Sequence, residues 1–333
     1  MQLNFKFKQY SVINFVQGAV LYGVALVVPL TAQACSSCGC TLSSEWESQG
    51  LSSASGLKLD LRYDYLNQSQ LRSGSGKVNR ANYPIGAAGR EIEIGTINRY
   101  TTLGIDYAPN ADWGINVQIP YIDRSHSTYG EDAADATESS ASHTRSLGDM
   151  KVIGRYQGFA ERKNFGVQVG MKLPTGSHGR NFNAGLSAGK LLDRGLQPGS
   201  DSTDLLLGLY HFDALSQNCD YFAQGMVQTP VATQDGFRPG TSLNLNLGLR
   251  YMALGNIQPQ LQINARTVAH DSGAQADRPN SGGNLAYFSP GVTVGVTRQT
   301  KLYGFVQLPI YQYVNGFQLA PRWTASVGAN FSF

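Results

Sequence analysis

Apolar and polar residues alternate strictly over long segments of this chain, starting at Leu57. In 57–65 (LKLDLRYDY), leucine and tyrosine fill the odd positions, and lysine, aspartate and arginine fill the even ones. Successive side chains of a β-strand point to opposite faces, so this segment is a strand with one apolar and one charged face. The period of an α-helix would mix the two sets. The same pattern recurs in 113–121, 165–173, 243–251 and 257–266.

The alternation predicts twelve strands separated by turn-forming residues. They cover 57–68, 91–108, 113–124, 147–158, 164–176, 201–212, 219–231, 241–253, 257–269, 283–296, 300–313 and 320–333. The second and tenth segments contain a phase slip, which predicts a β-bulge in each. Strands in soluble sheets usually have about five or six residues, whereas these match the roughly 9–11 residues of a tilted strand that crosses a bilayer.

The connections alternate between short turns and longer polar loops. Short turns fall at 109–112, 159–163, 213–218, 254–256 and 297–299. Outer-membrane barrels have this asymmetry, with short turns on the periplasmic rim and long loops outside. We therefore predict an all-β fold, a transmembrane antiparallel up-and-down β-barrel of about twelve strands. A soluble β-sandwich, with its apolar faces packed together and its polar faces in water, is the alternative.

The first 34 residues have the composition of a secretory signal peptide. Lys6 and Lys8 precede the apolar segment 19–30, and Ala32-Gln33-Ala34 supplies a small-residue cleavage site. We expect three regions: a signal peptide at 1–34, a Cys-rich N-terminal segment at 35–56, and the barrel at 57–333. Removal of the signal leaves 24 basic and 23 acidic residues. A chain so close to neutral is not expected to bind nucleic acid, and the cell outer membrane is its predicted location.

The last predicted strand ends in a pattern similar to the C-terminal signal that bacterial outer-membrane barrels present to their assembly machinery. Its residues are Gly328, Phe331 and Phe333, the final residue of the chain. The predicted partners are therefore the barrel-assembly machinery, outer-membrane lipid and a small-molecule solute.

Two short motifs carry a resemblance to a known family. Leu147-Gly148-Asp149 opens one predicted strand, and Leu173-Pro174-Thr175-Gly176 closes the next. These motifs resemble the transporter-type barrels named for the meta-pathway of phenol degradation, a group similar to the long-chain fatty-acid transporter barrels. The resemblance implies passive transport of small, often hydrophobic, organic molecules. Asp149 and Thr175 either fix the geometry of the hairpin or touch the solute.

The predicted mature chain begins with a cluster of cysteines, Cys35, Cys38 and Cys40, and a fourth, Cys219, follows a predicted periplasmic turn. All four could meet at one rim of the barrel. A disulfide that ties the N-terminal segment to the barrel is expected in an oxidising periplasm. The alternatives are a soft metal ion bound by thiolates, lipidation of Cys35, and a redox role. We also expect the segment 35–56 to act as a plug or gate of the barrel.

The polar faces of the strands are expected to line the lumen. The predicted lumen-lining residues are Lys58, Asp60, Arg62, Asp64, Lys151, Arg155, Lys172, Arg250, Arg266 and Arg322. In an open lumen this mostly basic set would favour polar or anionic solutes. In a narrow barrel the same residues would pair across strands and fill the interior.

Together these patterns predict an outer-membrane channel for the passive passage of small organic solutes, hydrophobic or anionic. The alternative is a structural or metal- or redox-linked barrel that uses the cysteine cluster. We expect no enzymatic activity, since no nucleophile motif, phosphate loop or metalloprotease signature is present, and no cofactor unless the cysteines bind a soft metal. We place His126, His143, His178 and His270 in solvated outer loops.

Overall fold

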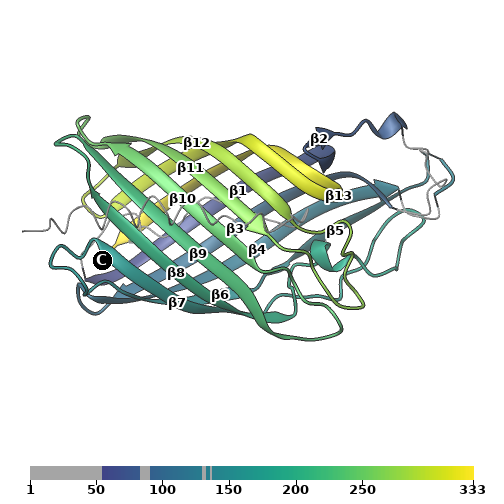
Figure 1. Ribbon diagram of the computed structural model, residues 1–333, viewed down its shortest axis with the longest axis horizontal. Helices are drawn as coiled ribbons and strands as arrows, with labels where there is room; N and C mark the ends of the chain where they lie inside the picture. The colour runs from purple at the N-terminus through teal and green to yellow at the C-terminus, as the bar shows by residue number, and fades with distance from the viewer. Residues whose placement is uncertain (1–54, 83–90, 130–132, 136) are drawn as a thin grey trace, which may run out of the picture. The chain divides into compact units, whose positions relative to one another are not determined.

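The computed structural model describes residues 55–82, 91–129, 133–135 and 137–333, and these form an antiparallel β-barrel (Figure 1). The strands are β1 (Gly56–Gly74), β2 (Gly76–Lys77), β3 (Ile92–Ala108), β4 (Trp113–Tyr129), β5 (Ser139–Leu147), β6 (Met150–Tyr156), β7 (Phe165–Leu173), β8 (Ser202–Ala214), β9 (Cys219–Thr233), β10 (Ser242–Tyr251), β11 (Ile257–Val268), β12 (Gly283–Gly295) and β13 (Thr300–Ser332). Two 3₁₀ turns, η1 (Arg80–Asn82) and η2 (Arg194–Leu196), complete the elements. Within the described part of the chain, no helix has the length and apolar character needed to span a bilayer.

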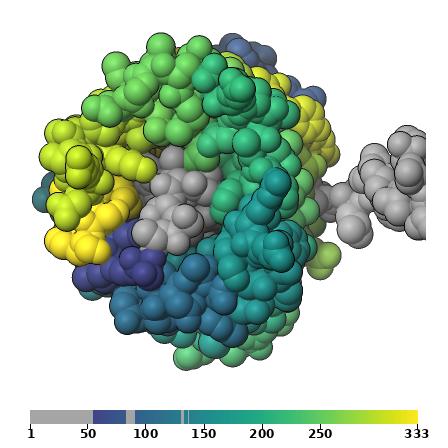
Figure 2. All heavy atoms as spheres, turned by 90° about the vertical axis from the view of Figure 1, so that its left-hand side faces the viewer, coloured from purple at the N-terminus to yellow at the C-terminus, as the bar shows by residue number. Residues whose placement is uncertain are grey.

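The sheet closes on itself where β1 meets β13. From β3 onward the strands pair in chain order, except that β5 and β6 both pair with β4. Residues 318–332 of β13 pair with β1, while residues 301–314 pair with β12. β13 folds back on itself so that its two ends meet: the amide of Ser332, at its end, donates to the carbonyl of Gln299, just before its start, at 2.8 Å. The ring therefore contains eleven named strands, with β13 filling two places, which confirms the predicted barrel of about twelve strands. Figure 2 shows the purple start of the barrel beside its yellow end.

The polarity of the barrel is the reverse of that of a soluble protein. In β10, Leu245, Leu247 and Leu249 point outward and are 45%, 56% and 49% exposed, whereas the inward Asn246 and Arg250 are 6% and 3% exposed. The exposed large apolar residues of the other strands likewise point outward, although some inward positions, such as Leu206 and Phe222, are also apolar. Among the described residues no second sheet covers this apolar exterior, so it requires hydrocarbon around it. The chain is thus an outer-membrane barrel, and the soluble sandwich is excluded.

Part of the predicted loop 125–146 is strand. β4 continues to Tyr129, and its upper half pairs with β5 while its lower half pairs with β6. β5 and β6 thus occupy successive stretches of one position in the ring, separated by Gly148 and Asp149. His126 and His143 lie on β4 and β5, so the prediction of loop positions was wrong for them. Alternation did not reveal β5 because this segment, SSASHTRSL, is polar on both faces.

Both predicted phase slips coincide with shifts in strand register. One shift lies between Glu93 and Gly95 of β3. The other lies between Ala286 and Tyr287 of β12, where the extra residue, Ile310, belongs to the partner strand β13. Each is an irregularity of the bulge type, which bends a strand and interrupts its ladder.

A chain of hydrogen bonds between polar side chains runs along the inner wall of the barrel from β7 to β13, and we call it the amide ladder. Its members are Gln168, Gln224, Asn246, Asn264, Ser289 and Gln307. At its centre, Asn264 Nδ2 donates to Asn246 Oδ1 at 2.7 Å, and Ser289 Oγ donates to Asn264 Oδ1 at 2.5 Å. Gly208 of β8 leaves room for Gln168 to reach across to Gln224, since a Cβ on Gly208 would lie 2.8 Å from Gln168 Oε1.

Candidate functional site

The long connection between β7 and β8 folds into the barrel. Its apolar residues Phe182, Leu192 and Leu196 form a buried cluster. Arg124, an inward residue of β4 that is 4% exposed, donates from its guanidinium to the backbone carbonyls of the connection at Gly195 (3.3 Å) and Gln197 (3.4 Å). Backbone carbonyls at a turn are therefore satisfied by a side chain of the wall, as buried polar groups must be. We call residues 177–200 the inward loop.

The base of the inward loop is formed by the Leu-Gly-Asp and Leu-Pro-Thr-Gly motifs. Asp149 accepts hydrogen bonds from the backbone amides of Gly176 (3.0 Å) and Ser200 (2.9 Å), so it joins β6 to both ends of the loop. Thr175 Oγ1 accepts from the Met150 amide at 2.9 Å and donates to the Gly148 carbonyl at 3.0 Å. These contacts favour the geometric role for both residues, although Asp149 also faces the cavity described below.

Two glycines allow the ends of the inward loop to touch. A Cβ on Gly199 would lie 2.3 Å from the Gly176 carbonyl oxygen, which is closer than any Cβ contact can be. The Gly199 amide donates to the Ser177 carbonyl at 2.8 Å. A Cβ on Gly176 would in turn lie 2.7 Å from Gly199 Cα, so the glycine of the Leu-Pro-Thr-Gly motif is also required by this close approach of backbones.

Arg194 and Phe237 narrow the barrel. The Arg194 guanidinium carbon lies 5.2 Å from the centre of the Phe237 ring, a cation–π geometry, and both side chains are buried. Each residue lines two separate cavities, one of about 330 Å³ and one of about 270 Å³. We call the larger the inner chamber, the smaller the outer vestibule, and the Arg194–Phe237 pair the constriction between them.

The inner chamber carries an excess of positive charge. Its basic residues are Arg62, Arg124, Lys151, Lys172, Arg194 and Arg266, against three acidic residues, Asp64, Asp149 and Asp271. Several of these charges are paired. Lys172 Nζ lies 2.9 Å from Asp204 Oδ2 and 3.4 Å from Asp149 Oδ2, and Arg62 Nε lies 2.8 Å from Asp64 Oδ2. The formal charges of the lining residues still sum to +3.

The outer vestibule has the opposite sign. Its acidic residues are Glu91, Glu93, Asp193, Asp271 and Asp277, against one arginine, Arg194. Asp193 lies in the inward loop and opens onto the vestibule. The protein around it restricts its hydration and Glu91 adds like charge and a hydrogen bond, so the pKa of Asp193 is raised to about 7. A solute that entered from this side would pass from an acidic space into a basic one.

Half of the predicted lumen-lining residues meet in the inner chamber, namely Arg62, Asp64, Lys151, Lys172 and Arg266. Four others lie nearer the short turns. There the Arg155 guanidinium donates to both carboxylate oxygens of Asp106, and Arg250 donates to both oxygens of Asp220 at 2.7 and 2.8 Å. Asp60 accepts a hydrogen bond from the Tyr303 hydroxyl at 2.9 Å, and Lys58 is buried with 3% exposed. Arg322 is exposed and lines a different hollow beside Arg72 and Lys77.

The remaining predicted sites are described in part. Cys219 opens β9, is half-buried, and forms no disulfide among the described residues, while Cys35, Cys38 and Cys40 lie outside them. Phe331 and Phe333 are exposed on the outside of the last strand at 38% and 71%. Gly328 faces inward under Tyr303, whose ring would clash with a Cβ there.

Sequence reasoning did not find the residues of the constriction. Arg194, Asp193 and Phe237 lie in connections that were predicted to be ordinary polar loops. One signal was present in the sequence: Phe182, Leu192 and Leu196 are large apolar residues inside a loop otherwise rich in glycine and polar residues. Such residues seldom remain in water, so they indicated that the loop packs against something.

Comparisons with known proteins identify the fold. No family model matches the sequence, and no curated protein is significantly similar to it. The COG4313 outer membrane channel from Pseudomonas putida superposes with a TM-score of 0.62 at 13% identity, over 84% of this chain and 96% of that one. The chain thus shares the β-barrel fold of this outer-membrane protein.

Two further solved structures are similar at a lower level. The β domain of the Bordetella autotransporter BrkA has a TM-score of 0.47 at 13% identity, over 84% of this chain and 100% of that one. The CymD monoaromatic hydrocarbon channel has a TM-score of 0.43 at 10% identity, over 91% of this chain and 98% of that one. These scores are too low to add to the assignment.

Proposed function

We propose that this chain is an outer-membrane channel through which small organic solutes cross by passive diffusion. The observation that supports this function best is the inner chamber, a cavity of about 330 Å³ inside a closed barrel whose outer surface is apolar. A purely structural barrel has no need of such a space. The size is at the lower end of the range for pockets that accept small ligands, about 300–1,000 Å³.

The solute class we propose is small organic anions. The lining of the inner chamber has six basic and three acidic residues, and rings of basic side chains select anions in pores. Arg266 is the clearest candidate for contact with the solute, because its buried Nε donates no hydrogen bond. Donors without partners in a cavity are groups that a carboxylate would satisfy.

The negative charge of the outer vestibule does not conflict with this proposal. Acidic residues at the entrance reject highly charged anions and admit monovalent or weakly charged ones more readily. The hydrophobic cargo that the family resemblance implies would instead have to avoid both charged cavities. The P. putida protein is named an outer membrane channel, which agrees with a channel but does not identify a solute.

Conductance across a planar bilayer tests the proposal. We expect the purified protein to form open channels that prefer chloride to potassium in a salt gradient. Replacing Lys151 and Arg266 together by glutamine lowers the formal balance of the chamber from +3 to +1 and should shift the reversal potential toward potassium. Arg162→Gln is the matched control, because this side chain is 79% exposed at a short turn.

Two results would refute the channel. One is the absence of conductance above the bare bilayer together with no swelling of liposomes in organic-anion solutions. The other is a selectivity that does not respond to the double substitution. We further propose that the chain has no catalytic activity, which a hydrolase assay in detergent checks, and that its C-terminal strand is presented to the barrel-assembly machinery.

A further inference from the structure

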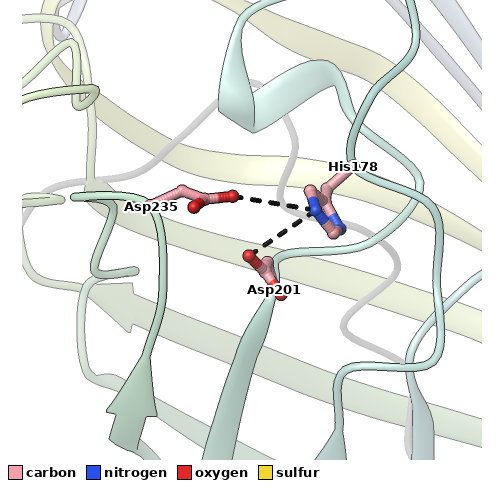
Figure 3. Close-up of side chains that lie close together, drawn as sticks. All are labelled: His178, Asp201 and Asp235. Atoms are coloured by element: carbon pink, nitrogen blue, oxygen red, sulfur yellow. Dashed lines mark ion pairs between the residues drawn. The ribbon is translucent and has the colours of Figure 1, made fainter.

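Three side chains with metal-ligating groups converge on the rim that carries the inward loop. His178 Nε2 lies 3.6 Å from Asp201 Oδ2 and 3.8 Å from Asp235 Oδ2, and the three ligand atoms lie within 4.8 Å of one another. Figure 3 shows both carboxylates turned toward the imidazole from separate segments of the chain. These segments are the first residues of the inward loop, the residue just before β8 and the turn after β9.

The distances are those of ligands around one ion and are too long for hydrogen bonds. A nitrogen–oxygen hydrogen bond has a length of about 2.7–3.2 Å. Ligands bound at about 2.0–2.1 Å in a tetrahedral site are separated by roughly 3.3 Å. The two nitrogen–oxygen separations of 3.6 and 3.8 Å need to close by only a few tenths of an ångström around a metal, and the two carboxylate oxygens lie within 4.8 Å of each other.

Asp201 provides an independent indication of a missing ligand. Its side chain is 6% exposed, and its Oδ2 atom, which faces His178, accepts no hydrogen bond. The nearest cation, Arg194 NH2, lies 3.6 Å away and its NH2 atom makes no hydrogen bond either. A buried carboxylate oxygen left in this state is costly, and a bound cation would satisfy it.

The backbone fixes the two carboxylates in place. Asp201 and Asp235 have φ values of 54° and 50°, in the left-handed region. Aspartate is one of the few side-chain-bearing residues that adopt this region at low cost. Asp235 and Gly236 (φ 66°) form a tight turn that leads directly to Phe237 of the constriction.

We propose that His178, Asp201 and Asp235 bind one divalent transition-metal ion, with Zn²⁺ the best match. One imidazole and two carboxylates suit zinc. By contrast, Ca²⁺ requires about six to eight oxygen ligands, and Mg²⁺ requires an octahedron of oxygen ligands. His178 and Asp235 are 40% and 58% exposed, so water completes the coordination. The ion joins both ends of the inward loop to the turn that carries Phe237, and it therefore braces the constriction.

Zinc binding to the metal-free full-length barrel in detergent tests the site. Every variant carries serine at the four cysteines, so that thiolates do not contribute. We expect one Zn²⁺ per chain by calorimetric titration. His178→Ala and Asp235→Asn should each weaken the affinity at least about 100-fold, because loss of even an outer-shell partner costs about 10–100-fold.

His143→Ala is the matched control, since His143 Nε2 lies 2.9 Å from Asp123 on the same side of the barrel but has no second carboxylate at ligand distance among the described residues. Its affinity should equal that of the parent. Folding of each variant is checked by heat-modifiable migration on gels. If His178→Ala does not fold, Asp235→Asn alone tests the site, because asparagine also adopts the left-handed backbone conformation of residue 235. Absence of zinc binding in the parent, or equal binding by the His178, Asp235 and His143 variants, would overturn the proposal.

Discussion

Replacing Asn264 by leucine tests whether the amide ladder is a dry, structural network or a row of hydrated groups. Asn264 is completely buried and lies at the centre of the ladder on β11. Its Nδ2 donates to Asn246 Oδ1 at 2.7 Å and to Gln262 Oε1 at 3.2 Å, and its Oδ1 accepts from Ser289 Oγ at 2.5 Å. Leucine has the same branching and the same number of heavy side-chain atoms, although it is bulkier, and it can make none of these bonds.

The expected loss of stability follows from the groups left without partners. Asn246 Oδ1 and Ser289 Oγ each lose their shortest contact in the ladder. A buried polar group left unsatisfied costs about 1–3 kcal/mol. Burial of the leucine side chain offsets part of this, because the site is already removed from water. We expect the free energy of unfolding to fall by about 2–4 kcal/mol.

Urea unfolding in lipid vesicles measures this change. Gln258→Leu on the same strand is the matched control, because Gln258 is half-buried and its Oε1 accepts no hydrogen bond. That substitution removes a group without a partner and should be neutral or slightly stabilising. If Asn264→Leu also changes stability by less than about 0.5 kcal/mol, water satisfies the ladder and the reasoning from buried amides is refuted.

Three further predictions concern the passage through the barrel. Gly199→Ala should push the two ends of the inward loop apart, since its Cβ would meet Gly176, and so raise single-channel conductance. Gly179→Ala is the control, because open space surrounds Gly179. Equal conductance of these two variants would contradict the close contact. Lowering the pH from 8 to 6 protonates Asp193, whose pKa is about 7, so the cation preference of the vestibule should fall, and Asp193→Asn should reduce this pH response of the reversal potential. Deleting residues 41–54 should raise conductance if the N-terminal segment is a gate, because the barrel itself begins at Gly56; unchanged conductance and solute uptake would end that idea.

The sequence by itself determined the strands and the faces that they present. A period of two is a local property of an extended chain, so the apolar positions of 57–65 or 243–251 identify the lipid face without knowledge of any neighbour. It also indicated the ring of about twelve strands and the register shifts of β3 and β12, but not those of β1 and β8. It did not predict β5, because this segment is polar on both faces and has no alternation to read.

The tertiary structure decided what fills the barrel. Whether Arg155 lines an open pore or pairs with Asp106, 49 residues away, depends on the register of three strands and not on either residue alone. The constriction depends likewise on Arg124 holding the backbone at Gly195 and Gln197, and on Gly176 meeting Gly199. Such contacts join residues that are distant in sequence and carry no local period, so the apolar residues of the inward loop indicated that it packs against something but not which residues of the wall it contacts.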